Sequence, residues 1–206
     1  MTLVDKPLRD LLAAFGSSDP TPGGGSASAL ASATGTALLR MVAGLPKTRN
    51  GTDEERAMLA AAASALSPIG RQLAQAIDDD ASAYDGVMAA YKRPKTSPDE
   101  QRQRKAAIQD ALRAATEVPL GVMALTADAL DHANAIAVHG HRAAASDVGV
   151  ALALLRAGFH GSRLNVETNL TGNKDEAYTH AVRAEVTRLT NRAAAAGLAA
   201  DDALSS

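Results

Sequence analysis

The stretch "DPTPGGGSASALASATGTALL" (residues 19–39) has two prolines and three consecutive glycines that run directly into a segment built almost wholly of Ala, Ser, Thr, Gly and Leu. It predicts a helix over residues 26–45, in which thirteen of the twenty residues are Ala, Ser, Thr or Gly and only Arg40 is charged. Small and apolar residues therefore occupy every side of this helix. That pattern is typical of a central helix whose neighbours approach its backbone closely.

The glycine run itself has two interpretations. The backbone N–H groups of a Gly-rich turn at a helix N-terminus can bind an anion or a polar ligand, and Gly24, Gly25 and Ser26 would supply them here. Alternatively, Ser26 is an ordinary N-cap and the glycines only allow a tight entry into the helix. A phosphate-binding P-loop is excluded, because no Lys stands between Gly25 and Ser26. Local sequence favours the simple helix entry, although three glycines exceed what a cap requires.

Composition narrows the class of protein. The chain has 206 residues, a length that fits one domain (1–206, with a core of about 3–197 and a frayed C-terminal tail). Its net charge of −2 argues against nucleic-acid binding, and the absence of Cys excludes disulfides and thiolate chemistry. Four charged residues within the first ten leave no apolar signal-peptide core, and no segment is apolar enough to span a membrane. We therefore expect a cytoplasmic protein.

The rest of the chain predicts long helices and no strand, because apolar residues recur at helical spacing and never alternate strictly. The fold class expected is an all-α bundle of long, kinked antiparallel helices. The first expected helix covers residues 3–15, with a buried stripe of Val4, Leu8, Leu11, Leu12 and Phe15. The next covers residues 52–90, starts at a Thr52/Glu55 capping box and is bent at Pro68, and the one after it covers residues 97–140, starts at Ser97, is kinked at Pro119 and is closed by Gly140. The last two cover residues 146–170, capped by Ser146 or Asp147, and residues 175–196, ended by Gly197.

The segment "DDDASAYDGVMAAYKRPK" (residues 78–95) holds the first candidate chemical groups. Asp80 and Tyr84 are four residues apart and share a helix face, and Lys95 belongs to a cationic cluster where Pro94 breaks the helix. Together they can supply a general base and an anion contact. An acidic helix face with a basic C-terminal end explains the same residues without any function.

Two further motifs follow. "HGHRAAASDVGV" (residues 139–150) contains Ser146 and Asp147, and its histidines lack the carboxylate or Cys spacing of a metal site. "LNVETNL" (residues 164–170) places Asn165 and Asn169 on one face of an apolar helix, where amides are unfavourable unless they are paired or face a ligand or a subunit boundary. Asp147 and Asn165 are about 27 Å apart along a straight helix. They therefore contact opposite ends of a long ligand, or one of them comes from a partner subunit.

Taken in order, "PTPGGGSASAL", "DDDASAYDGVMAAYKRPK", "ATEVPL", "ASDVGVALAL" and "RLNVETNL" resemble the cyclodeaminase/cyclohydrolase family, which includes the C-terminal domain of formiminotransferase-cyclodeaminase. The resemblance covers residues 3–197, and the overall pattern is most like that of the stand-alone methenyltetrahydrofolate cyclohydrolases. The chain departs from the family pattern at Arg93, where an apolar residue is usual, and at His141, where Asn is usual.

The resemblance implies hydrolysis of 5,10-methenyltetrahydrofolate to 10-formyltetrahydrofolate by a homodimer without a metal or other cofactor, with the folate substrate near the subunit boundary. The alternatives are a formiminotetrahydrofolate cyclodeaminase that releases ammonia, which we favour less because no formiminotransferase domain is attached, and a non-catalytic helical folate-binding dimer. The expected catalytic residues are Asp147, slightly preferred over Asp80 for proton transfer, with Lys95 and Tyr84; the expected substrate-binding residues are Gly24, Gly25, Ser26, Ser146, Asn165 and Asn169.

Overall fold

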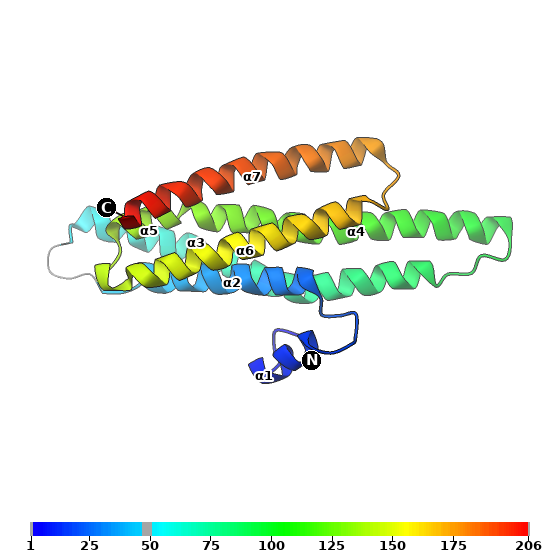
Figure 1. The fold of residues 1–206 in the computed structure, drawn as a ribbon, viewed down its shortest axis with the longest axis horizontal. Helices are drawn as coiled ribbons and strands as arrows, with labels where there is room; N and C mark the ends of the chain where they lie inside the picture. Colours follow the sequence, from blue (N-terminus) through cyan, green and yellow to red (C-terminus); the bar gives the residue numbers. More distant parts are fainter. Residues whose placement is uncertain (1, 47–50, 206) are drawn as a thin grey trace.

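Long helices that run lengthwise form the body of the molecule (Figure 1). The computed structural model describes residues 2–46 and 51–205, and these residues contain helices and no strand. The all-α prediction is thereby confirmed. The helices are α1 (Leu8–Phe15), α2 (Gly24–Ala43), α3 (Asp53–Tyr91), α4 (Pro98–Asp131), α5 (Ala133–His139), the 3₁₀ turn η1 (Arg142–Ala144), α6 (Ala145–Leu170) and α7 (Glu176–Ser205).

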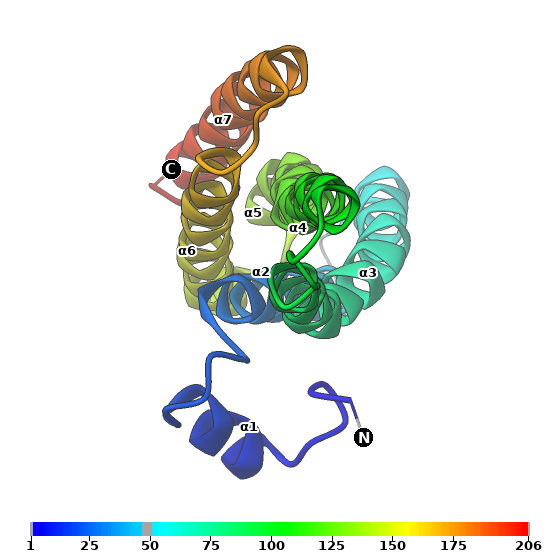
Figure 2. The ribbon, with the colours of Figure 1, turned by 90° about the vertical axis from the view of Figure 1, so that its right-hand side faces the viewer.

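Helix α2 lies between α3 and α6 and packs against both (Figure 2). Its small residues allow a very close approach to α6. A Cβ atom added to Gly158 would lie only 2.6 Å from the backbone oxygen of Ser28, and one added to Gly35 would lie 2.8 Å from the backbone oxygen of Ala151. The prediction of a central helix with close neighbours is therefore confirmed.

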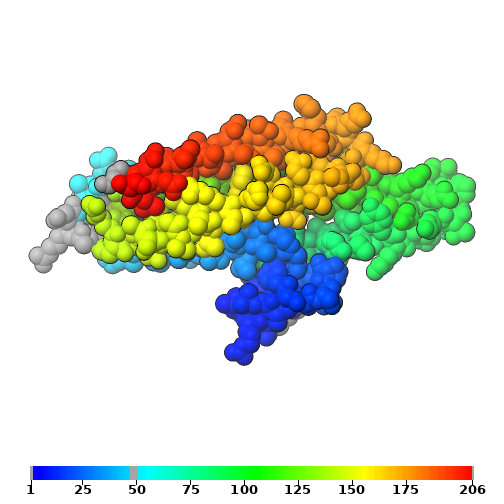
Figure 3. All heavy atoms as spheres, in the orientation of Figure 1, coloured from blue at the N-terminus to red at the C-terminus, as the bar shows by residue number. Residues whose placement is uncertain are grey.

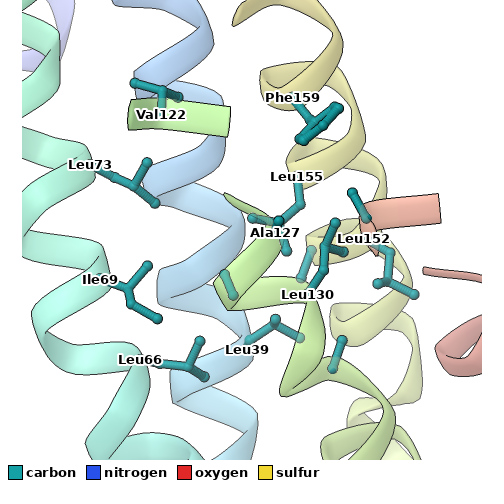
Figure 4. Close-up of a cluster of buried hydrophobic side chains, with 14 of the residues drawn as sticks. Leu39, Leu66, Ile69, Leu73, Val122, Ala127, Leu130, Leu152, Leu155 and Phe159 are labelled. Atoms are coloured by element: carbon teal, nitrogen blue, oxygen red, sulfur yellow. The ribbon is translucent and has the colours of Figure 1, made fainter. Parts of the chain in front are cut away.

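Aliphatic side chains from α2, α3, α4 and α6 fill the space between these helices (Figure 4). Leu39, Leu73, Leu130 and Leu155 are almost completely buried there. Small hydroxyl residues share the interior, and the Thr126 hydroxyl lies 2.8 Å from the Ser32 hydroxyl across the α2–α4 contact. The scarcity of aromatic residues thus reflects a core of branched aliphatic and small side chains.

The sequence signals at the starts of α3 and α4 are confirmed. Thr52 and Glu55 form a reciprocal capping box, and Ser97 and Glu100 form another. Pro68 and Pro119 lie inside their helices, as expected.

The helix expected over residues 97–140 is divided in two, and the start of the next helix also differs from the prediction, whereas Gly140 ends its helix as expected. Helix α4 ends at Asp131, and α5 continues after a break at His132 until Gly140 stops it. A Cβ atom at Gly140 would lie 2.3 Å from the backbone oxygen of Ile136, which explains the glycine. Neither Ser146 nor Asp147 caps α6, because the 3₁₀ turn makes Ala144 its N-cap residue.

The predicted burial of the N-terminal stripe is wrong. Helix α1 begins only after Pro7, and of its apolar residues only Leu11 is buried, whereas Leu8 is 66% and Leu12 58% exposed. The helix lies on an arm that projects from the bundle (Figures 1–3). Apart from Leu11, the residues of the stripe are not buried by the part of the chain that the structure describes.

The prediction of a frayed tail after Gly197 is also wrong. Helix α7 runs through Gly197 to Ser205, Ala200 is completely buried, and Leu204 packs against the core. Gly197 does not end the helix. It leaves room for the guanidinium of Arg156, which crosses α7 there and pairs with Asp201.

Candidate functional site

A cavity of about 320 Å³ opens where α2 begins and α6 ends, at the point where α3 and α4 continue beyond both as a hairpin (Figure 1). The loop before α2 and the helices α2, α3, α4 and α6 all contribute to its walls. The lining residues are Pro20, Thr21, Gly23, Gly24, Gly25, Asp80, Ala83, Tyr84, Val87, Ala115, Asn165, Thr168 and Asn169.

This cavity brings together six of the ten predicted site residues, from segments that are far apart in the sequence. They are Gly24, Gly25, Asp80, Tyr84, Asn165 and Asn169. A larger hollow of about 560 Å³ lies farther along the α3–α4 hairpin, but it is lined mainly by alanines and contains none of the predicted residues. The convergence of polar groups, rather than size, marks the smaller cavity as the candidate site.

Ser26 is not the N-cap of α2, contrary to the simpler of the two interpretations. The helix starts two residues earlier, at Gly24, so Gly23 is the N-cap residue and makes no side-chain capping hydrogen bond. Asp80 of α3 takes that role instead: its Oδ2 accepts hydrogen bonds from the backbone N–H of Ser26 at 2.8 Å and from the Ser26 hydroxyl at 3.0 Å. The hydroxyl also lies 2.9 Å from the backbone oxygen of Ile77, so its single proton serves one acceptor at a time. A carboxylate at a helix N-terminus is also favoured by the helix dipole.

Gly25 is the residue that allows this contact. A Cβ atom at position 25 would lie 2.0 Å from Oδ1 and 2.5 Å from Cγ of Asp80, so any side chain would displace the carboxylate. The backbone N–H groups of Gly24 and Gly25, in the first turn of α2, have no acceptor among the described residues. The site thus combines a carboxylate with two unused backbone donors.

Burial raises the pKa of Asp80, because removal from water disfavours its charged form. The hydrogen bonds from Ser26 act in the opposite direction and are the smaller effect. A carboxyl whose pKa lies above the ordinary range is better suited to accept and return a proton near neutral pH.

The amide of Asn169 fills a gap that a proline creates. In α4 the backbone oxygen of Ala115 would normally accept a hydrogen bond from residue 119, but Pro119 has no N–H. Asn169 Nδ2 donates to that oxygen at 2.7 Å. Asn165 Nδ2 likewise donates to the backbone oxygen of Gly161, at 2.8 Å. Sequence reasoning placed both amides in the site but missed the link to Pro119, which requires knowing that α4 and α6 are adjacent.

Tyr84 lies at the open side of the cavity with 38% of its surface exposed. Sequence reasoning missed several lining residues. Thr21 and Pro20 adjoin the glycine run and could have been found from it. Ala115 and Thr168 carry no local signal of function, because alanine and threonine are common throughout these helices.

Four of the predicted residues do not line the cavity: Ser26, which is buried behind Asp80, and Lys95, Ser146 and Asp147. Lys95 is exposed in the connection between α3 and α4, past the end of α3 at Tyr91. Asp147 and the exposed Ser146 lie in the first turn of α6, whereas Asn165 lies near its other end. Within one chain the geometry therefore does not support the preference for Asp147 over Asp80.

Within residues 2–46 and 51–205, no group of three or more His, Cys, Asp or Glu side chains gathers in a way that could hold a metal ion. Over the same residues, none of the helices has both the length and the apolar character needed to cross a membrane.

Comparison with known proteins shows which chains this one is similar to. Residues 7–188 match the family described as formiminotransferase-cyclodeaminase. The chain is 37% identical to the methenyltetrahydrofolate cyclohydrolase of Methylorubrum extorquens, over 83% of this chain and 82% of that one. It is 32% identical to the formimidoyltransferase-cyclodeaminase of Sus scrofa over 93% of this chain, but it spans only 36% of that protein.

A solved structure shows the same fold. The formiminotetrahydrofolate cyclodeaminase of Thermotoga maritima superimposes with a TM-score of 0.87 and 25% identity, covering 98% of this chain and 96% of that one. With the family match over most of its length, the chain belongs to the formiminotransferase-cyclodeaminase family.

Proposed function

We propose that the protein hydrolyses 5,10-methenyltetrahydrofolate to 10-formyltetrahydrofolate. The observation that carries the proposal is the partly buried Asp80 carboxylate beside the free N–H groups of Gly24 and Gly25, in one cavity. The cyclohydrolase of Methylorubrum extorquens, which aligns with most of this chain, supports the choice of substrate.

The chemistry of the substrate fits these groups. The methenyl carbon bridges two nitrogens as a cationic amidinium, so a nearby carboxylate stabilises the bound substrate and can also receive a proton from an attacking water. The oxygen added to that carbon acquires negative charge as its proton leaves, before the C=O bond is complete. Preorganised backbone donors such as those of Gly24 and Gly25 stabilise charge of that kind.

The proposed reaction proceeds in two steps. Water adds to the methenyl carbon, a C–O bond forms, and Asp80 accepts the proton that the water loses. The bond from this carbon to N5 then breaks, N5 takes a proton from Asp80, and the hydroxyl loses its proton to solvent as the formyl C=O forms on N10. Tyr84 positions the substrate at the mouth of the cavity. The steps use water and protein groups alone, so we propose that no metal or other cofactor is required.

The second candidate activity is cyclodeamination of 5-formiminotetrahydrofolate. It is favoured by the likeness to the Thermotoga maritima cyclodeaminase, and it forms a bond to the same carbon. One pair of assays separates the two reactions: loss of the near-UV absorbance of methenyltetrahydrofolate, measured against its spontaneous hydrolysis, and appearance of that absorbance from the formimino substrate. Acceleration of the first reaction supports our proposal, and acceleration of the second alone refutes it. If neither reaction is accelerated, stabilisation of the fold by tetrahydrofolate identifies a non-catalytic folate-binding protein.

We also propose that the protein is a homodimer in the cytoplasm and that the partner subunit supplies Asp147 and Lys95 to the site. The uncovered apolar residues Leu8 and Leu12 of α1 support an interface between subunits. Light scattering gives the mass. If the site is shared, mixing and refolding two inactive variants, Asp80→Asn and Asp147→Asn, restores about a quarter of the wild-type activity through random pairing. An Asp147→Asn or Lys95→Met variant with normal turnover removes that residue from the mechanism.

A further inference from the structure

Two side-chain amides in the candidate site are held in fixed orientations. Asn165 and Asn169 are four residues apart on one face of α6, and both line the cavity. Each uses its NH₂ group to donate to a backbone carbonyl, of Gly161 and Ala115 respectively. The Oδ1 atom of each amide has no hydrogen-bond donor among the described residues.

The orientation of Asn169 follows from the chemistry of its partner. A carbonyl oxygen can only accept a hydrogen bond, so the side of the amide that faces Ala115 must be its NH₂ group. Pro119 makes this partner permanent, because it removes the N–H that would otherwise compete for the same oxygen. The amide cannot rotate by 180° without leaving that buried carbonyl unpaired.

We propose that Asn165 and Asn169 are specificity-determining residues, whose Oδ1 atoms accept hydrogen bonds from the donor edge of the pteridine ring, where a 2-amino group adjoins a ring N–H. The inference rests on the proposed function, because it places the pteridine of the folate in this cavity. Two acceptors on one wall match a ligand edge that offers two donors, and a site built in this way rejects an analogue that lacks one of them.

The experiment compares methenyltetrahydrofolate with its 2-desamino analogue, in which hydrogen replaces the exocyclic amino group. We expect the kcat/KM of the wild-type protein to be at least about tenfold higher for the parent compound. In the Asn165→Ala/Asn169→Ala double variant the ratio of the two kcat/KM values falls to near one, because the two amide oxygens that distinguish the compounds are absent. Thr168→Ala is the matched control. It removes a hydroxyl from the same cavity that already donates to the backbone oxygen of Leu164, so the ratio stays at the wild-type value.

A second variant separates substrate recognition from a purely structural role. Asn169→Ala leaves the Ala115 carbonyl unpaired and lowers stability, and adding Pro119→Ala restores a helical N–H to that carbonyl. The Pro119→Ala/Asn169→Ala protein should therefore regain the stability that Asn169→Ala lost, while its ratio of kcat/KM values stays reduced to the same degree as in Asn169→Ala. A return of the wild-type ratio together with stability shows that Asn169 acts only on the backbone of α4.

The inference is overturned if the wild-type protein does not distinguish the two compounds, or if the Asn165→Ala/Asn169→Ala variant keeps the wild-type ratio. Either result leaves the proposed function intact, because that function depends on hydrolysis of the parent compound. If the wild-type protein fails to accelerate hydrolysis, the proposed function fails separately. Dissociation constants for tetrahydrofolate and its 2-desamino analogue, measured by calorimetry, then give the same comparison, and absence of binding overturns both.

Discussion

Substitution of Gly25 by alanine tests the contact on which the site depends. The added Cβ would lie 2.0 Å from Oδ1 of Asp80, and the carboxylate must retreat by about 1.4 Å to restore an ordinary contact of 3.4 Å. The main chain at Gly25 cannot give way easily, because it belongs to the first turn of α2. We therefore expect the Asp80 side chain to move and its two hydrogen bonds from Ser26 to lengthen or break.

The size of the effect follows from these contacts. Loss of hydrogen bonds to a charged group that also caps a helix lowers the free energy of unfolding by about 2–4 kcal/mol. For a domain of this size that corresponds to a fall in Tm of about 10 °C. Misplacement of a reacting group by about 1 Å reduces the rate by about 100-fold. We expect both losses in Gly25→Ala.

Tm is measured by calorimetry, and turnover by the loss of methenyltetrahydrofolate absorbance. Two controls are built into the chain. At Gly24 a Cβ atom would meet only Asn165 Nδ2, at 3.8 Å, so Gly24→Ala leaves Asp80 in place and should have a much smaller effect on stability. At Gly86 nothing lies within 4 Å, and Gly86→Ala should match the wild-type protein in turnover. A Gly25→Ala protein with wild-type Tm and turnover would refute the reasoning.

Other changes test different parts of the structure. Burial holds the pKa of Asp80 above its ordinary value of 3.8, so the folded state retains this proton more tightly than the unfolded state and stability falls as pH rises through the folded-state pKa. The free energy of unfolding of Asp80→Asn, measured in urea, should therefore rise relative to that of the wild-type protein as the pH increases from 3 to 7, and turnover should be lost. A difference that stays constant across this range would mean that the pKa of Asp80 is not raised by folding. Gly158→Ala places a Cβ atom 2.6 Å from the Ser28 oxygen and should lower the free energy of unfolding by about 3 kcal/mol. Gly149→Ala is the control on the same helix: a Cβ atom there has nothing within 4 Å, so this change should raise the free energy of unfolding by up to about 1 kcal/mol. Equal effects of the two changes would mean that α2 and α6 are not in close contact. Truncation after Gly197 removes the buried Ala200 and the Arg156–Asp201 ion pair, and should lower the free energy of unfolding by about 2 kcal/mol. Thermal melts measure the effect, and an unchanged Tm would mean that the last turns of α7 are frayed.

The features that could be predicted from the sequence are those with local causes. The capping box at Thr52, for example, depends on residues only three positions apart. The small-residue composition of residues 26–45 identifies a central helix, because only small side chains allow two backbones to approach so closely.

The features that could not be predicted depend on which helices are neighbours. The apolar stripe of α1 shows that one face avoids water, but not whether the same chain covers it. The glycine at 197 looks like a terminator because sequence does not show the Arg156 side chain that crosses there. In the candidate site, the pattern identified Asp80 and Asn169 as polar groups on apolar helices. Their partners, Ser26 and Ala115, are 54 residues away in each case and became visible only in the structure.

The cap that α3 supplies to α2 also has a consequence for the order in which the protein folds. Helix α3 carries its own capping box and can begin to form from local interactions, whereas α2 starts at a glycine that offers no cap of its own. The first turn of α2 therefore becomes stable only when Asp80 arrives with the docked α3. Partly folded chains in which these helices have not met then contain neither the positioned carboxylate nor the ordered Gly24 and Gly25 donors. Recovery of turnover during refolding should coincide with docking of the two helices, and should come later than the appearance of helical signal.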